Sequence, residues 1–237
     1  MRTHAHLFST PICLPAFVLM EDLPAGVDAR KDYNDEGRKL IRALGFNSSA
    51  TTVYNDMDAI FKDPSTGGVV YVGNEVAARG PATKLLSLGI THVVNCTDDM
   101  KNFCEVPETY EPHPMANAKR IKYLRFNIAQ YRAAGEKLRE HPASETEIDQ
   151  FIRTLFAFVS EALAGGGSVL VHCLAGAHRA GTTGCLLLMW KAGLGALEAV
   201  KAAKSLRPVI NPIGGLPGLL RLFEHRRDKV LEFETAS

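Results

Sequence analysis

A cysteine lies between an apolar segment and an arginine six residues further along the chain. Residues 169–171 are Val-Leu-Val, and residues 185–190 beyond the arginine are again apolar. These runs predict a buried strand before Cys173 and a buried helix after Arg179. A short loop between a strand and a helix can turn several backbone N–H groups toward one anion, and the helix N-terminus adds roughly half a positive charge. The arrangement is typical of a phosphate-binding site.

The cysteine gives this loop a chemistry that nucleotide-binding loops lack, since no Gly-Lys-Ser/Thr sequence follows it. A thiol among N–H donors, near a helix N-terminus and an arginine, should be ionised partly or wholly at neutral pH. The thiolate is the nucleophilic form, and the planar guanidinium of Arg179 can hold two phosphate oxygens. Gly176 permits a turn with positive φ close to the anion. A lone buried cysteine is usually a small core residue, but Cys173 combined with Gly176 and Arg179 indicates a nucleophile.

The sequence from His172 to Arg179 resembles the His-Cys-x5-Arg signature of cysteine-dependent protein tyrosine phosphatases, and its Ala-Gly pair is most similar to their dual-specificity branch. The resemblance extends to Val70–Asn74, to Leu88–Asn95 and to positions between 199 and 224, and so covers residues 68–230. It implies hydrolysis of phosphomonoesters, namely phosphotyrosine and also phosphoserine or phosphothreonine in proteins, through a cysteinyl-phosphate. No cofactor and no metal are expected, because the arginine and the backbone dipoles supply the positive field.

The resemblance also assigns roles within and around the loop. The expected phosphate-binding residues are Leu174, Ala175, Gly176, Ala177, His178 and Arg179. His172 is expected to hydrogen-bond to the backbone and so to hold the loop, and His178 either adds charge beside the phosphate or faces the solvent. The family commonly has Ser or Thr after the arginine, where the hydroxyl helps the thiolate to leave. This chain has Ala180 there, so either Thr182 or Thr183 replaces that hydroxyl or the cysteinyl-phosphate breaks down slowly.

The family also uses an aspartate to protonate the leaving oxygen, and this chain departs from that pattern. Counting forward from the preceding strand places Gln130 at the aspartate position, whereas counting back from Cys173 reaches His141. The segment 130–144 therefore carries an insertion, and it contains no aspartate. Glutamine cannot donate a proton near neutral pH. The candidate acids are Glu136, Glu140, His141, Asp149, Asp98 and Asp99, and the sequence does not choose among them.

Alternating apolar segments supply the framework that must position these residues. Strands are predicted at 69–72, 90–95, 121–126 and 169–171, and helices at 81–88 and 145–164. Strands that alternate with helices predict an α/β fold, and the resemblance implies a central mixed, mostly parallel sheet flanked by helices. Such sheets bind ligands at the carboxyl ends of their central strands, which is where Cys173 is expected.

Residues 1–67 are predicted to form a partly helical N-terminal extension, and residues 68–237 to form the catalytic domain. Within the extension, helices are predicted over residues 31–44 and 54–61. The sequence Pro-Ser-Thr-Gly-Gly at 64–68 indicates the boundary. The extension either packs on the domain or binds a partner, and its recurring apolar residues favour packing.

Composition narrows the class of protein. The 237 residues are 46% hydrophobic and 22% charged, with a net charge of +1, so the charge balance favours neither nucleic acid nor a membrane surface. Five cysteines without a Cys-x-x-Cys pair predict a reducing compartment, the cytoplasm or the nucleus, and argue against a disulfide scaffold or a zinc site. Cys96 or Cys104 either is a plain buried cysteine or forms a disulfide with an oxidised Cys173.

The expected partner is a phosphorylated protein or a small phosphorylated substrate, and the oligomeric state is not predicted. Two other functions stay open. Because the expected aspartate is missing, the chain could be a phosphate-binding pseudophosphatase or interaction module. It could also hydrolyse inositol phosphates or RNA 5′ ends, although the lysines that phosphoinositide enzymes of this superfamily carry in the loop are absent here.

Overall fold

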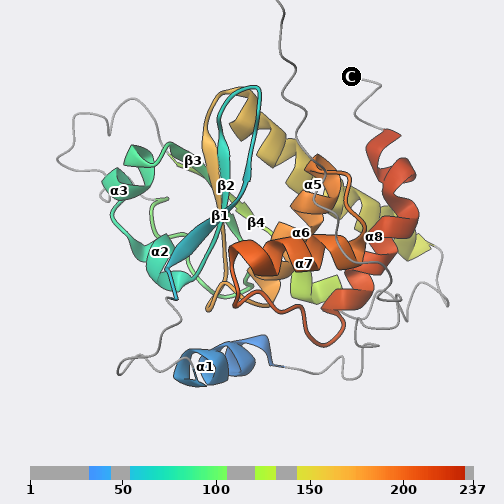
Figure 1. The fold of residues 1–237 in the computed structure, drawn as a ribbon, viewed down its shortest axis with the longest axis horizontal. Helices are drawn as coiled ribbons and strands as arrows, with labels where there is room; N and C mark the ends of the chain where they lie inside the picture. The colour runs from blue at the N-terminus through green and yellow to red at the C-terminus, as the bar shows by residue number, and fades with distance from the viewer. Residues whose placement is uncertain (1–31, 44–53, 106–120, 132–142, 233–237) are drawn as a thin grey trace, which may run out of the picture.

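A five-stranded sheet runs through the middle of the molecule (Figure 1). The computed structural model describes residues 32–43, 54–105, 121–131 and 143–232. The strands are β1 (Met57–Lys62), β2 (Val69–Gly73), β3 (Ile90–Asn95), β4 (Lys122–Arg125) and β5 (Ser168–His172). Their order across the sheet is β1-β2-β5-β3-β4; β1 runs antiparallel to β2, and the other neighbours are parallel. The sheet is therefore mixed and mostly parallel, as predicted.

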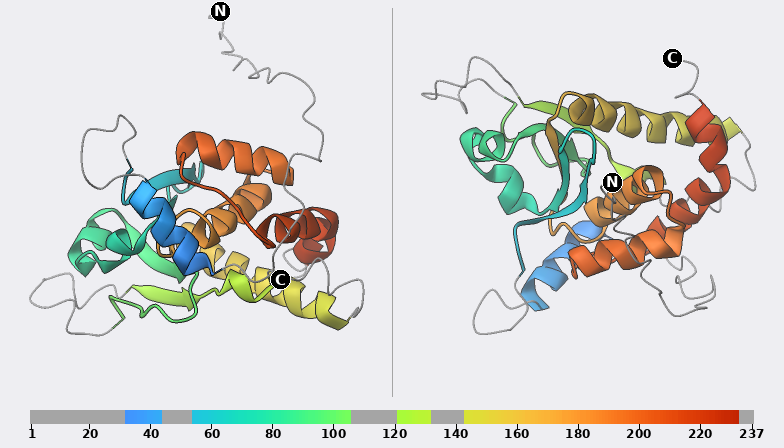
Figure 2. Two further views of the ribbon diagram at one scale, coloured as in Figure 1. Left: turned by 90° about the horizontal axis from the view of Figure 1, so that it is seen from below. Right: turned by 45° about the horizontal axis from the view of Figure 1, so that its top comes forward.

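Helices cover both faces of the sheet (Figures 1 and 2). On one face lie α2 (Glu75–Arg79) and α3 (Ala82–Ser87), and on the other lie α5 (Ala143–Ala164), α6 (Arg179–Lys191), α7 (Ala196–Leu206) and α8 (Leu216–Leu231). Helix α1 (Tyr33–Ala43) lies below the sheet in Figure 1, and the 3₁₀ turn η3 (Ile128–Tyr131) follows β4. No single helix of the described residues is long and apolar enough to cross a membrane; α6 and α7 meet that criterion only as a pair bent by 117°.

The apolar face of α5 packs into the core as its sequence pattern predicts. The buried side chains on that face are Ile148, Ile152, Leu155, Phe156, Val159 and Leu163. Phe156 also stacks on Trp190 of α6, with ring centroids 4.2 Å apart. This contact joins α5 to α6 and so fixes the layer of helices behind the cysteine.

Helix α6 is enclosed by the core. Every residue from Arg179 to Trp190 is buried, which explains why apolar side chains occur all round this helix rather than along one stripe. The helix packs against β2 and β5 and against its neighbours α7 and α8. The first residue of this helix, Arg179, is thereby held by one of the most buried elements of the fold.

Strand β1 shows that the prediction of a short helix over residues 54–61 was wrong. The backbone from Met57 to Lys62 pairs with β2, and Ile60 turns into the core with an exposure of 4%. Pairing with a neighbouring strand and burial of one face outweigh the local preference for a helix. Strand β1 belongs to the segment assigned to the N-terminal extension, yet it forms the edge of the same sheet as β5. The other helix predicted in that segment is confirmed as α1.

Candidate active site

Cys173 lies at the carboxyl end of the central strand. In the ladder, His172 pairs with Gly73 of β2 and with Asn95 of β3, so the next residue emerges between two neighbouring strand ends. The Cys173 side chain is buried, with an exposure of 3%. Helix α6 begins six residues later at Arg179, and the partial positive charge of its N-terminus is directed at the intervening loop. Residues 173–178 are called the Cys173 loop below.

Four consecutive carbonyl groups of the Cys173 loop point away from its centre. They accept hydrogen bonds from residues outside the loop: Leu174 from the Glu75 N–H (3.0 Å), Ala175 from the Tyr54 hydroxyl, Gly176 from Arg207 Nε (3.0 Å) and Ala177 from the Asn211 N–H (3.0 Å). In a trans peptide the N–H points in the direction opposite to the preceding carbonyl. The N–H groups of residues 175–178 therefore point toward the centre of the loop, where they form a ring of donors for an anion.

Arg207 holds the outer side of the Cys173 loop. It lies at the C-terminal end of α7 and is 1% exposed. Its guanidinium donates to the carbonyls of Gly176 (3.0 Å) and Ala175 (3.4 Å) and to the carboxylate of Asp58 on β1 (2.5 Å). Arginine has enough donors to serve all three acceptors at once. No local sequence pattern indicates this role of Arg207, because its partners lie 31 and 149 residues away.

Gly176 has a φ of +64°, which confirms the conformation predicted at this position. A Cβ atom there would lie 2.5 Å from the carbonyl oxygen of Gly73 and 2.8 Å from Nη2 of Arg207. Both the backbone conformation and the close approach of β2 therefore require glycine.

Two groups from distant parts of the chain lie against the guanidinium of Arg179. Nη2 donates to the side-chain oxygen of Asn34 on α1, and Nη1 lies 3.8 Å from Oδ1 of Asp98, which follows β3. Arg179 is 3% exposed, whereas the Asp98 side chain is 66% exposed. The guanidinium has five N–H groups, so donors remain for an anion at the loop. Asn34 was not among the predicted site residues, since its partner is 145 residues away.

Both histidines beside the loop are buried. Burial lowers the pKa of His172 to about 3, so its ring is neutral at neutral pH. The nearby Cys173 backbone raises the pKa and so opposes part of this shift. Neither ring nitrogen of His172 makes a hydrogen bond to the described residues. His178 is 6% exposed, and its Nδ1 atom lies 2.6 Å from the carbonyl oxygen of Asn211. His178 therefore faces protein rather than solvent, which excludes one of its two predicted placements.

The hydroxyl groups of Thr182 and Thr183 are engaged within α6. Thr182 donates to the carbonyl of His178 (2.7 Å), and Thr183 donates to that of Arg179 (3.0 Å). The Cys96 thiol in turn donates to the Thr183 hydroxyl at 3.4 Å. Because each hydroxyl already has an acceptor, either threonine must rotate before it can assist chemistry at the cysteine.

The candidate disulfide partners lie in different cores. Cys96 follows Asn95, which pairs with His172 in the sheet. The Cys96 N–H donates to the His172 carbonyl at 2.9 Å, so Cys96 neighbours Cys173. Burial raises the pKa of the Cys96 thiol far above its ordinary value. Cys104 packs instead in the core beneath α2 and α3. The four described cysteines are buried free thiols.

The candidate proton donors fall in separate places. Asp98 lies beside Arg179, and Asp99 lines a cavity next to the Cys173 loop. Asp149 is 6% exposed, and its two oxygens accept from the guanidinium of Arg226 at 2.9 and 2.6 Å, which ties α5 to α8. The remaining candidates, which lie outside the described residues, are Glu136, Glu140 and His141.

Comparisons with known proteins agree with this geometry. The family model described as "Dual specificity phosphatase, catalytic domain" matches residues 70–226. Dual specificity protein phosphatase 15 of Rattus norvegicus is 28% identical over 154 residues, which are 65% of this chain and 54% of that protein. Dual specificity protein phosphatase 22-A of Danio rerio is 32% identical over 158 residues, 67% of this chain and 63% of that protein.

The chain thus spans a little over half the length of these two relatives. Among solved structures, human DUSP28 superposes with a TM-score of 0.51 and 22% identity, covering 76% of this chain and 99% of that one. This likeness shows that the fold is shared. The chain belongs to the dual-specificity phosphatase family.

Proposed function

We propose that this chain is a cysteine-dependent protein phosphatase that hydrolyses phosphomonoesters through a cysteinyl-phosphate. The observation that carries the proposal is the outward direction of the four carbonyls of the Cys173 loop, because it turns the corresponding N–H groups toward one anion. A nucleophile lies at the base of that ring, and the guanidinium of Arg179 lies at its edge. These are the parts that phosphoryl transfer requires.

In the first step the Cys173 thiolate attacks phosphorus in line with the leaving oxygen. A sulfur–phosphorus bond forms, the ester phosphorus–oxygen bond breaks, and the leaving oxygen takes up a proton. The N–H groups of the loop and the guanidinium of Arg179 hold the three other oxygens, and they matter most as charge redistributes in the transition state. Water then attacks phosphorus, which releases inorganic phosphate and restores the thiolate.

The charge that favours the thiolate comes from Arg179 and the helix N-terminus. His172 directly precedes the nucleophile in the chain, but burial keeps its ring neutral above a pKa of about 3. It therefore adds no positive charge at neutral pH. A reducing compartment, the cytoplasm or the nucleus, suits a reaction that requires a free thiolate, and the described cysteines are all free.

The leaving group needs an acid, and among the described candidates Asp98 is supported best. Its carboxylate lies 3.8 Å from Nη1 of Arg179 and is two-thirds exposed, which leaves it accessible to a substrate. Asp149, by contrast, has both oxygens occupied by Arg226. The Ala180 position lacks the hydroxyl that assists the departure of the thiolate in the family, so we expect breakdown of the cysteinyl-phosphate to limit the steady rate.

The test is hydrolysis of a simple aryl phosphate by the wild-type chain and by Cys173→Ser. We expect the wild type to release an initial burst of phenol followed by a slower steady rate, and the variant to show neither while still binding vanadate or phosphate. Phosphotyrosine and phosphoserine peptides then define the substrate range. Equal activity of the wild type and Cys173→Ser would overturn the mechanism. Binding of phosphopeptides without turnover would identify the interaction module instead.

A further inference from the structure

Helix α1 lies outside the residues matched by the family model, yet it docks directly on the Cys173 loop. Its start is capped by Asp32, whose carboxylate accepts from the N–H groups of Asn34 (2.9 Å) and Asp35 (3.2 Å). Tyr33 is 6% exposed and belongs to the main core. A Cβ atom on Gly37 would lie 3.4 Å from Leu174, which shows how closely the helix approaches the loop. Helix α1 is therefore a wall of the site.

Two further side chains of α1, Asn34 and Arg38, lie on the face of the helix that is near Arg179 and the Cys173 loop. Residues four apart on a helix share a face, and Asn34 and Arg38 form such a pair. Asn34 accepts a hydrogen bond from Arg179, the expected phosphate ligand. Arg38, one turn further along, lines a cavity beside the loop. Arg38 thus follows Asn34 by about 6 Å along the helix axis.

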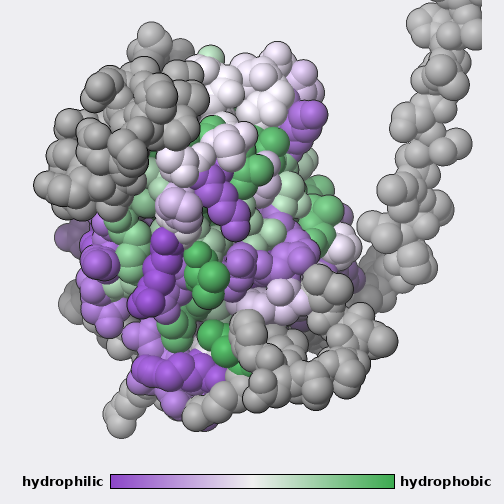
Figure 3. Space-filling view, turned by 90° about the vertical axis from the view of Figure 1, so that its left-hand side faces the viewer, coloured by the Kyte–Doolittle hydropathy of each residue, from purple (hydrophilic) through white to green (hydrophobic). Residues whose placement is uncertain are grey.

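The cavity has a volume of about 410 Å³ and lies between α1, α2 and the segment that follows β3. It is lined by Asn34, Arg38, Glu75, Arg79, Asp99, Met100, Lys101, Phe103 and Leu174. Because Leu174 belongs to the Cys173 loop, the cavity adjoins the expected phosphate site. Hydrophilic side chains gather at the lower end of the face that carries α2 and α3, where α1 lies (Figure 3). We call this cavity the α1 pocket.

Positive charge exceeds negative charge in the α1 pocket. Its lining contains three cationic and two anionic side chains, and Glu75 is already paired with Arg79. Lys101 lies 5.6 Å from the centre of the Phe103 ring, and within the described ranges neither Lys101 nor Arg38 has a carboxylate in ion-pair contact. Two cations of the lining, Arg38 on α1 and Lys101 on the segment after β3, are thus available to a ligand, opposed in the lining only by Asp99.

We propose that the α1 pocket binds a second anionic group of the substrate, carried next to the phosphate that is hydrolysed. The inference rests on the proposed function, since it takes the Cys173 loop as the site of the first phosphate. Either a carboxylate or a second phosphate has the required charge, and both bind guanidinium and ammonium groups. Helix α1 is accordingly a specificity element, which selects phosphopeptides with an acidic group beside the phosphotyrosine.

The test compares three phosphotyrosine peptides that differ only in the neighbouring residue, which is Gln, Glu or phosphoserine. We expect the wild type to show a kcat/KM about five- to tenfold higher for the Glu and phosphoserine peptides than for the Gln peptide. The double variant Arg38→Gln with Lys101→Gln should reduce that preference to about twofold or less. A larger preference for phosphoserine than for Glu would identify the second group as a phosphate.

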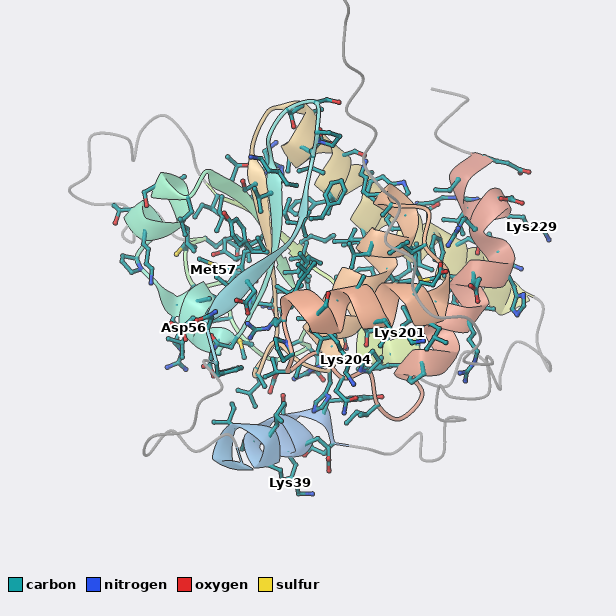
Figure 4. The ribbon with its side chains drawn as sticks, in the orientation of Figure 1. Lys39, Asp56, Met57, Lys201, Lys204 and Lys229 are labelled. Carbon is teal, nitrogen blue, oxygen red and sulfur yellow. The ribbon has the colours of Figure 1, made fainter. Side chains whose placement is uncertain are left out.

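Lys39→Gln provides the matched control on the same helix. Lys39 is exposed, pairs with Asp35 and Glu36, and points away from the sheet (Figure 4). This variant removes the same charge as Arg38→Gln but should retain the preference for acidic peptides. If Lys39→Gln lost the preference to the same extent as the double variant, the preference would be a general effect of net charge. That result would overturn the proposal that the α1 pocket binds the second anionic group.

A binding measurement separates failure of this inference from failure of the proposed function. Fluorescence anisotropy with the three peptides and the Cys173→Ser chain should give the same order of affinities, and the differences should shrink as salt is added. If the wild type hydrolyses aryl phosphate but treats the Gln, Glu and phosphoserine peptides equally, the inference about the α1 pocket is wrong and the proposed phosphatase activity stands. If no aryl phosphate is hydrolysed, the proposed phosphatase activity is wrong. The order of peptide affinities still tests whether the α1 pocket binds a second anionic group.

Discussion

Arg207 donates a hydrogen bond of 3.0 Å from Nε to the carbonyl oxygen of Gly176. The same guanidinium reaches Asp58 on the edge strand, so one buried side chain links the end of α7, the Cys173 loop and β1. The contact fixes one of the four outward carbonyls on which the ring of N–H donors depends. Arg207 is therefore a positioning residue that lies behind the loop.

Replacement of this arginine should loosen the loop. In Arg207→Lys the charge is kept, but the ammonium cannot serve Gly176, Ala175 and Asp58 together. We expect a loss of about 2–3 kcal/mol in the free energy of unfolding, and a fall of about 10- to 100-fold in kcat/KM for an aryl phosphate. Urea denaturation and steady-state kinetics measure the two effects. Lys201→Gln, an exposed change on α7 (Figure 4), should alter neither quantity; an unchanged Arg207→Lys enzyme would contradict the assignment.

Gly176 and Gly193 offer a matched pair of substitutions. Both have positive φ, +64° and +67°. A Cβ atom at Gly176 would contact the Gly73 carbonyl, whereas no atom lies within 4 Å of a Cβ atom built at Gly193. We expect Gly193→Ala to cost about 1 kcal/mol through backbone strain alone. Gly176→Ala should cost more and should also lower kcat/KM. Thermal unfolding and aryl phosphate kinetics on both variants decide the point, and equal effects would mean that the close approach of β2 is unimportant.

The role of Asp98 can be tested by measuring how the rate of hydrolysis depends on the basicity of the leaving group. A proton donor contributes about 10²–10⁴-fold where the leaving oxygen is strongly basic and much less where it is not. Asp98→Asn should therefore slow hydrolysis of a phosphoserine peptide far more than that of an activated aryl phosphate. Asp149→Asn should instead lower stability by breaking the pair with Arg226, with no change in leaving-group dependence. If Asp98→Asn slows both substrates equally, the acid lies among Asp99, Glu136, Glu140 and His141.

The buried His172 predicts how stability depends on pH. Its pKa is lowered from 6.5 to about 3 in the folded chain, so between these values the unfolded chain binds a proton that the folded chain does not. Stability due to this group is complete above pH 6.5 and falls as the pH is lowered, by up to about 1.4 kcal/mol per pH unit. Urea denaturation from neutral pH down to about pH 5 should show a shallower slope for His172→Asn than for the wild type. An equal slope for His172→Asn and the wild type would contradict this interpretation.

The sequence predicted the centre of the site because its determinants are local. An apolar strand, a glycine with positive φ and a buried helix follow one another within Val169–Trp190, and each has a signal in its own residues. The amphipathic pattern of α5 was equally readable, since helical spacing alone determines which side chains are buried.

The supporting residues could not be found in this way. Arg207 contacts the Cys173 loop, and Asn34 contacts Arg179, only because the chain folds back, over 145 residues in the second case. Nothing in the residues beside them signals that contact. Strand β1 was mistaken for a helix because its structure derives from pairing with β2 rather than from its own preference. The proton donor stays a prediction because charged residues give no indication of which one faces the leaving group.

Helix α6 begins with Arg179 and is buried along nearly its whole length. The guanidinium proposed to bind the substrate is thus anchored in the part of the protein expected to open last, so amide hydrogens around it should exchange only through global unfolding. Activity and the folded state should then disappear together on heating, without an earlier stage in which the reaction centre alone is lost. Changes in what this chain recognises are therefore expected to come from substitutions at the periphery of the site, because the centre cannot be altered without disturbing the core.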